Sequence, residues 1–200
     1  MYTFKNFVSE SIEPWSFKVQ NLPDSSTRKK NKWVDFKAQK SPYILVKIGM
    51  TTKTVGTRLK EWENKCHHKL VNLGPMNRHL VLDQESSSVK ALISGFLGLH
   101  ITKQATSNDI AAYRRYKQEG FYCQENLDSV EKRIHQSLRH TYGAGDVYCK
   151  GCAPTTPTVK VKGGRAPFPV YNTHKEFFLI PKKDIDSIYE LIDSICVKYG

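Results

Sequence analysis

The apolar residues of this chain fall into short runs of two kinds, and this constrains the fold more than any other feature. Two runs are nearly continuous, at residues 43–48 and 177–180, and Pro or Gly bounds each of them. Such runs, rich in β-formers, predict buried strands. In residues 55–66, 126–140 and 185–195, apolar residues recur three or four apart, which predicts amphipathic helices. The sequence therefore predicts an α+β fold.

Capping residues and turn signals predict where these elements begin and end. Thr54 is a suitable N-cap for the first helix, Gly143 ends the second, and Asp184 precedes the third. Weaker patterns predict strands at residues 69–73 and 79–82, and helices at residues 89–99 and 108–118.

The same patterns suggest three parts along the chain. We expect residues 1–41 to form a peripheral N-terminal extension with a basic arm, and residues 42–181 to form the main domain with an insertion near residues 75–124. Residues 182–200 are expected to form a C-terminal helix packed on that domain.

The chain is strongly basic, with 31 Lys and Arg residues against 19 acidic ones and a net charge of +12. This excess attracts polyanions such as nucleic acid, although a soluble basic surface or an acidic protein partner is the alternative. A membrane is not favoured, because no apolar run approaches the ~20 residues of a spanning helix. Five cysteines without a visible export signal predict reduced thiols and an intracellular protein, nuclear if the source is a eukaryote.

Arg58 is the first candidate for chemistry. It lies one turn into the helix that follows the strand and glycine turn of Val46-Lys47-Ile48-Gly49. A guanidinium near the end of a strand can hold a phosphate through two hydrogen bonds. The alternative is an ordinary exposed helical arginine.

Glu131 and His135 are the second candidates, because they are four residues apart and share one helix face beside the apolar stripe. A half-buried carboxylate can hold a Mg²⁺ that bridges a phosphate, and a histidine can move protons. The alternative is a surface pair of little energetic weight.

Cys149 and Cys152 form a CxxC motif with His174 downstream, which is half of a zinc site. A fourth ligand is needed, and Cys66 at the end of the first helix is the preferred candidate. His67, His68 and Cys123 are rivals. The alternative is a reduced cysteine pair on a loop, without zinc.

Taken in order, these patches resemble a bacteriophage-derived DNA-binding domain family of the GIY-YIG nuclease superfamily. The cysteine-bearing form looks like its fungal branch, the meiotically up-regulated nuclease-like proteins. The resemblance covers roughly residues 41–180 and rests on the following motifs: Lys47-Ile48-Gly49-x-Thr51, Arg58-Leu59-x-x-Trp62 with Cys66, Glu131-x-x-x-His135, Cys149-x-x-Cys152, and His174-x-Glu176-Phe177-Phe178.

The resemblance implies a small antiparallel sheet flanked by helices, and Mg²⁺-dependent phosphodiester cleavage in active members. It makes Arg58 the phosphate clamp and Glu131 the metal ligand, with His135 and Glu176 supporting the site. Two departures weigh against cleavage. The second signature tyrosine is replaced by Lys47. The first motif is expected near residues 32–36, where no Gly-Ile-Tyr occurs, and Tyr43 is on the wrong strand.

The leading hypothesis is a DNA-binding protein that contacts the phosphate backbone of double-stranded DNA. An active endonuclease and a non-enzymatic protein-interaction module are the alternatives. The residues expected to contact nucleic acid are Lys47, Lys53, Arg58, Lys60, Lys160, Lys162 and Arg165.

Overall fold

The computed structural model describes residues 1–8, 17–19, 34–38, 41–82, 112–143, 145–149 and 172–200. The strands are β1 (Tyr2–Phe4), β2 (Phe17–Val19), β3 (Val34–Asp35), β4 (Tyr43–Lys47), β5 (Leu70–Asn72), β6 (Tyr116–Lys117), β7 (Gly120–Phe121), β8 (Gly145–Cys149) and β9 (Asn172–Pro181). The α-helices are α1 (Val55–Cys66), α2 (His79–Leu82), α5 (Leu127–Tyr142) and α6 (Ile185–Tyr199), and 3-10 turns cover Lys5–Phe7, Pro75–Asn77 and Lys182–Asp184.

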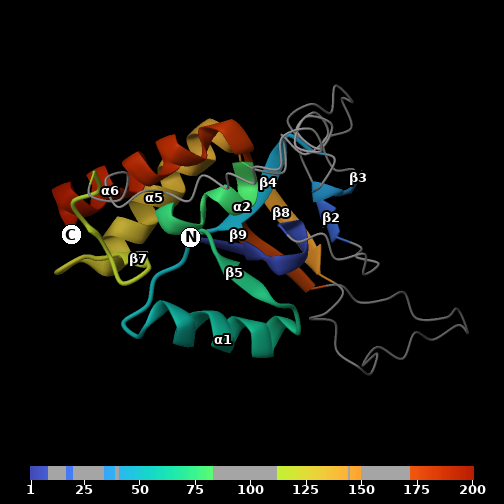
Figure 1. The fold of residues 1–200 in the computed structure, drawn as a ribbon, viewed down its shortest axis with the longest axis horizontal. Coiled ribbons are helices and arrows are strands. Elements are labelled where there is room, and N and C mark those ends of the chain that lie inside the picture. The colour runs from blue at the N-terminus through green and yellow to red at the C-terminus, as the bar shows by residue number, and fades with distance from the viewer. Residues whose placement is uncertain (9–16, 20–33, 39–40, 83–111, 144, 150–171) are drawn as a thin grey trace, which may run out of the picture.

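One antiparallel sheet organises the domain. Its seven strands follow the order β3-β2-β8-β9-β4-β1-β5, while β6 and β7 form a separate hairpin. Helices α5 and α6 lie on one side of the sheet and α1 lies on the other (Figure 1). The expected α+β fold with an antiparallel sheet and a C-terminal helix is confirmed.

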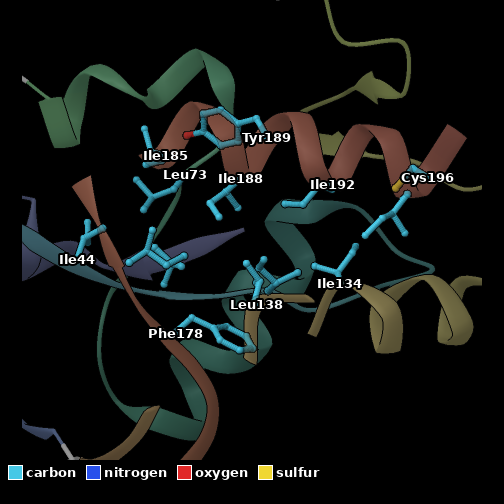
Figure 2. Close-up of a cluster of buried hydrophobic side chains, with 14 of the residues drawn as sticks. Ile44, Leu73, Ile134, Leu138, Phe178, Ile185, Ile188, Tyr189, Ile192 and Cys196 are labelled. Atoms are coloured by element: carbon cyan, nitrogen blue, oxygen red, sulfur yellow. The ribbon is translucent and has the colours of Figure 1, made fainter. Parts of the chain in front are cut away.

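The face of the sheet toward α5 and α6 holds the larger core. Alternate residues of β4 and β9, such as Ile44 and Phe178, pack against Leu138 of α5 and Ile188 of α6 (Figure 2). Burying each such side chain contributes roughly 1.5–3 kcal/mol. This core fixes α5, and with it Glu131 and His135, beside the end of β4.

The opposite face is buried as well. Leu45, Phe177 and Leu179 pack there with Phe4 of β1 and Cys66 of α1. The rings of Phe4 and Phe177 are stacked with centroids 5.3 Å apart. Burial on both faces explains why the two strand segments of the sequence are continuously apolar instead of alternating.

The strongest helix patterns are reproduced closely. Helix α1 has the predicted bounds, and the Thr54 hydroxyl accepts a hydrogen bond from Thr57 N at 3.2 Å. Helix α6 begins after Asp184 as expected, but that carboxylate accepts a hydrogen bond from the Tyr142 hydroxyl and does not cap the helix.

Two weaker predictions are wrong. Residues 79–82 form the short helix α2 and not a strand, because four residues are too few for periodicity to decide. Residues 112–121 form turns and the β6–β7 hairpin, where a helix was predicted over 108–118. Their aromatic residues pack on Tyr189 of α6 and do not form a helix stripe. The helix expected at 89–99 lies outside the described residues.

The N-terminal residues are not peripheral. Strand β1 is inserted between β4 and β5, with Tyr2 opposite Lys47 in the register. Strands β2 and β3 extend the other end of the sheet. The assignment of residues 1–41 as an extension outside the domain is therefore wrong for these strands, because pairing with β4 and β8 places them in the sheet. Residues 20–33, which include most of the expected basic arm, lie outside the described residues.

Candidate functional site

Tyr2 is the residue at the centre of the site that the sequence did not reveal. Its side chain is buried, and among the described residues its hydroxyl has no hydrogen-bond partner. Burial raises the pKa of Tyr2, and the nearby Arg58 guanidinium opposes that shift, while Glu131 and Glu176 reinforce it. The sequence-predicted residues Arg58, Glu131 and Glu176 therefore all lie near enough to this hydroxyl to interact with it electrostatically.

Glu131 faces the same space from helix α5. Its Oε1 atom accepts a hydrogen bond from the backbone N–H of Met50 at 2.9 Å. A Cβ built on Gly49 would lie 3.9 Å from both Glu131 Oε1 and the Tyr2 hydroxyl, so these two oxygens flank the glycine. This contact fixes the carboxylate at the end of β4 and leaves its second oxygen without a hydrogen-bond partner among the described residues.

Arg58 reaches the site from helix α1. Its Nη1 atom lies 3.3 Å from Glu61 Oε2, and its guanidinium lies over the Trp62 ring at 5.3 Å. The Nε atom is buried without a partner among the described residues. Together with Tyr2 and Glu131, Arg58 lines a pocket of about 120 Å³. A group with accepting oxygens would satisfy this buried donor.

Lys47 is buried next to the pocket and is not exposed on the surface. Its Nζ atom lies 4.2 Å from the centre of the Trp62 ring and 3.5 Å from Glu176 Oε2. Burial lowers the pKa of Lys47, and the Glu176 carboxylate partly offsets that effect. Lys47 therefore lies beside the pocket, at the position where the second signature tyrosine of the resembled family is expected.

Glu176 is positioned by an irregularity in strand β9. Between Phe177 and His174, β9 has one more residue than its partner β8, which is a β-bulge. Glu176 has a φ of 71° there, a left-handed conformation that costs a non-glycine residue roughly 1–3 kcal/mol. The bulge places Glu176 beside Lys47. Without the extra residue, regular pairing between β8 and β9 would shift this part of β9 by one residue.

His135 is buried behind the site. Its Nε2 atom lies 2.9 Å from the Ile48 carbonyl oxygen, which can only accept, so Nε2 carries the proton in this contact. The ring also packs on Phe178 with centroids 5.5 Å apart. These contacts make His135 a support for the end of β4 and do not favour the role in proton transfer that the sequence suggested.

Two of the four expected zinc ligands are in contact. Cys66 Sγ lies 3.5 Å from His174 Nε2, although α1 and β9 are far apart in the sequence. Cys149 is the last residue of β8, the strand in which Val147 pairs with His174 of β9. Cys152 lies outside the described residues. Within the described residues alone, no group of three metal-binding side chains occurs.

The remaining candidates for nucleic-acid contact are distributed unevenly. Lys53 and Lys60 are exposed on the α1 side of the site, and Lys53 forms an ion pair with Glu61. Lys160, Lys162 and Arg165 lie outside the described residues. None of the helices in the described ranges is long and apolar enough to cross a bilayer.

The motifs around this pocket match a known family. The T5orf172 domain family matches residues 32–193 of the chain. The chain belongs to the T5orf172 domain family. The chain is also 31% identical to the Saccharomyces cerevisiae protein named "Uncharacterized protein YPL034W", over 172 residues that cover 74% of this chain and 96% of that protein. No solved structure matches.

The match confirms the resemblance at the level of the T5orf172 family, whereas the link to the GIY-YIG superfamily and its fungal branch stays a prediction. Arg58, Glu131 and Glu176 lie within the matched residues, but Tyr2 lies outside them. The first signature strand was expected near residues 32–36. The structure instead pairs β3 with β2 and places β1 beside β4. The alternation of Tyr2 and Phe4 is the one sequence signal that pointed to β1.

Proposed function

We propose that the chain binds DNA at the pocket lined by Tyr2, Arg58 and Glu131 and hydrolyses a phosphodiester bond there, as a GIY-YIG-type endonuclease. One observation carries this proposal. Two buried polar atoms without partners, the Tyr2 hydroxyl and Arg58 Nε, belong to residues that share a pocket with an anchored carboxylate. Such groups are costly in a folded protein unless a ligand satisfies them.

The charges around the pocket suit a phosphodiester. Arg58 offers a guanidinium for the non-bridging phosphate oxygens, on which negative charge increases in the transition state. The raised pKa of Tyr2 keeps its hydroxyl protonated at neutral pH, so it acts by hydrogen bonding to water or to a phosphate oxygen. Tyr2 thus supplies the aromatic hydroxyl that the sequence lacked at position 47, and this favours cleavage over binding alone.

Glu131 fits a Mg²⁺ ion. One of its oxygens is anchored by Met50 N–H, and the other makes no hydrogen bond to a described residue. Mg²⁺ is commonly held by one or two carboxylates and by the phosphates of the substrate, which is the donor set available here. When bound, the ion would neutralise negative charge on the scissile phosphate and its leaving oxygen.

In the proposed hydrolysis, the oxygen of a water molecule forms a bond to phosphorus, and the bond from phosphorus to a sugar oxygen breaks. The attacking water releases a proton to solvent, and the leaving oxygen takes one up from solvent, so the protons balance. Arg58 orients the phosphate, the Tyr2 hydroxyl orients the water, and His135 holds the end of β4 in place through the Ile48 carbonyl.

A nicking assay tests cleavage directly. Supercoiled plasmid is incubated with Mg²⁺ and the wild type, Tyr2→Phe, Arg58→Ala or Glu131→Gln. The glutamine variant keeps an acceptor for Met50 N–H, so it should fold normally. Loss of one stabilising group costs roughly 10²–10³-fold in rate, so each variant should nick far more slowly. Met76→Ala, at an exposed position outside the pocket, should match the wild type.

Binding is measured separately, on duplex DNA at several salt concentrations. Counterion release requires the affinity to fall steeply with salt, and Arg58→Ala should weaken it. Salt-dependent binding without nicking would leave a DNA-binding protein and reject the nuclease. No binding to DNA at any salt concentration would reject both and favour a basic surface for an acidic protein partner.

We further propose that Cys66 and His174 hold a structural zinc ion together with Cys149 and Cys152. The 3.5 Å contact between Cys66 and His174 supports this, since these residue types are zinc ligands. Purified protein should contain about one zinc per chain, and Cys66→Ser should lower both the zinc content and the thermal stability. A fully folded protein without zinc would remove this proposal.

A further inference from the structure

A groove leads away from the pocket, and the described part of the insertion forms one of its walls. Residues 51–55 lie on one side and residues 117–127 on the other, enclosing about 630 Å³. Thr51, Val55 and Phe121 line both the groove and the pocket, so the two spaces adjoin. A polymer whose scissile bond lies in the pocket would therefore extend along this groove.

The lining of the groove suits a nucleic-acid strand. Most of its polar side chains are uncharged hydroxyls and amides, among them Thr52, Thr54 and Gln124. The charged side chains among the residues that line it are Lys53, Lys117 and Glu125. The N-terminus of α1 also lies at the groove, and its partial positive charge favours a phosphate. Neutral donors and lysines contact a sugar–phosphate backbone without reading its sequence.

Tyr122 is an exposed aromatic side chain in this groove. It is 42% exposed, and the guanidinium of Arg115 lies over its ring at 5.2 Å. The ring is not part of either core cluster. Aromatic rings presented in polar grooves are the usual platforms on which unpaired bases stack.

The segment that carries Tyr122 is anchored firmly. The Asp193 carboxylate of α6 accepts hydrogen bonds from the backbone N–H groups of Arg114 at 3.2 Å and Arg115 at 2.7 Å. Asn72 of β5 donates to the Glu119 carbonyl at 2.8 Å. Tyr122 is therefore held in position before any ligand binds, which reduces the entropic cost of binding.

This segment also contains backbone strain. Gln118 and Glu119, the two central residues of the β6–β7 turn, have φ values of 51° and 68°, and Asn126 has 54°. Such a turn favours Asn and Gly, so Gln and Glu cost stability there. Gln118 and Asn126 line the groove, and Glu119 lines the pocket. Strain at successive positions around one cleft is a common feature of functional sites.

From these observations we propose that the groove between residues 51–55 and 117–127 binds the nucleotides beside the scissile bond, with one unpaired base stacked on Tyr122. This inference rests on the proposed function, because it extends the same site. It makes the preferred ligand a DNA strand with unpaired nucleotides, such as a single strand or a flap beside a duplex. Intact duplex lacks a free base for the ring.

Fluorescence anisotropy with the full chain tests the proposal at one fixed salt concentration without Mg²⁺. The three probes are a single-stranded oligonucleotide, a blunt duplex, and the same duplex with an unpaired flap. Loss of one base–aromatic stack weakens binding by about 5- to 150-fold. Tyr122→Ala should therefore lose this factor on the single strand and the flap but keep the affinity of the wild type for the blunt duplex.

Two variants serve as controls. Tyr122→Phe keeps the stacking ring and should bind all three probes like the wild type. Met76→Ala removes another exposed apolar side chain, one that does not line the groove, and should change nothing. Because Tyr122 is exposed, its variants should melt at the same temperature as the wild type, which thermal unfolding checks.

The outcomes separate this inference from the proposed function. A wild type that binds only the blunt duplex, or a Tyr122→Ala variant that binds every probe like the wild type, overturns the stacking groove and leaves DNA binding intact. Equal losses on all three probes also overturn it, because the ring would then act without an unpaired base. A wild type that binds no probe overturns both.

Discussion

Replacing Tyr2 by Phe should stabilise the protein while impairing its function. The hydroxyl is buried and has no partner among the described residues, whereas the ring is part of the packed sheet. A buried polar group without a partner costs roughly 1–3 kcal/mol, and Phe removes that cost without changing the ring. We expect the free energy of unfolding to rise by about 1 kcal/mol, which for a chain of this size raises Tm by about 2–4 °C.

Tyr189 provides the matched control, because it is equally buried but satisfied. Its hydroxyl donates a hydrogen bond to the Gly74 carbonyl at 3.3 Å. That carbonyl also accepts from Asn77 N–H at 2.9 Å, so it keeps a partner when the hydroxyl is removed. Tyr189→Phe should therefore lose only the net value of one hydrogen bond, about 0.5–1.5 kcal/mol. The two substitutions are chemically identical and should have opposite signs.

Urea unfolding followed by circular dichroism, without DNA, measures both changes. The pH dependence adds a second readout. Because burial raises the pKa of Tyr2 above its ordinary value of 10, the unfolded chain ionises first, and the stability of the wild type falls as pH rises above 10. The Tyr2→Phe variant lacks this ionisable group, so its free energy of unfolding should fall less over the same pH range. If Tyr2→Phe destabilised the protein as much as Tyr189→Phe, the hydroxyl would have a partner in the unliganded protein, and the reasoning for the site would be refuted.

Three further predictions concern the parts that support the site. Leu138→Ala removes a fully buried side chain under α5 and should cost about 2–5 kcal/mol in urea unfolding, whereas Val197→Ala at an exposed position should cost less than about 0.5 kcal/mol. Asp193→Ala removes two hydrogen bonds from backbone N–H groups to a carboxylate. It should raise the rate of amide hydrogen exchange in residues 112–122 and weaken the binding of single-stranded DNA, as Tyr122→Ala does. An unchanged exchange rate would show that other contacts anchor residues 112–122. Burial raises the pKa of Cys196 to about 12, so the free energy of unfolding should fall as pH rises above about 9. Cys196→Ala should lessen that fall in pH-dependent unfolding, and an equal fall in both proteins would contradict it.

The sequence predicted the elements whose patterns are set by burial. Helix α1 and helix α5 have apolar stripes, and β4 and β9 are apolar because both faces of the sheet are covered. Arg58, Glu131 and Glu176 were found through motif order, and in the structure all three interact electrostatically with Tyr2. Local periodicity and capping were sufficient to predict these helices and strands, because the tertiary contacts agree with the local preferences of their residues.

The sequence failed where long-range pairing decides the structure. A strand as short as β1 has no pattern beyond the alternation of Tyr2 and Phe4. Its place beside β4 depends on hydrogen bonds with residues about 45 positions away in the chain. The bulge at Glu176 could not be predicted from the sequence either, because glutamate is not a residue type that favours a positive φ. The β6–β7 turn was hidden for the same reason, since Gln118 and Glu119 are not residues that favour it.

Several energetically unfavourable features of the fold lie at the site. The Tyr2 hydroxyl, Arg58 Nε, and the strained residues Glu119 and Glu176 lie in or beside the pocket. Each lowers the stability of the unliganded protein. Buried atoms without a partner among the described residues also occur away from the pocket, at Asn72 and His79, but the two at the pocket are donors that a phosphodiester there would satisfy. The proposed function therefore rests less on the net charge of the chain than on the two buried donors and the strained residues in or beside the pocket.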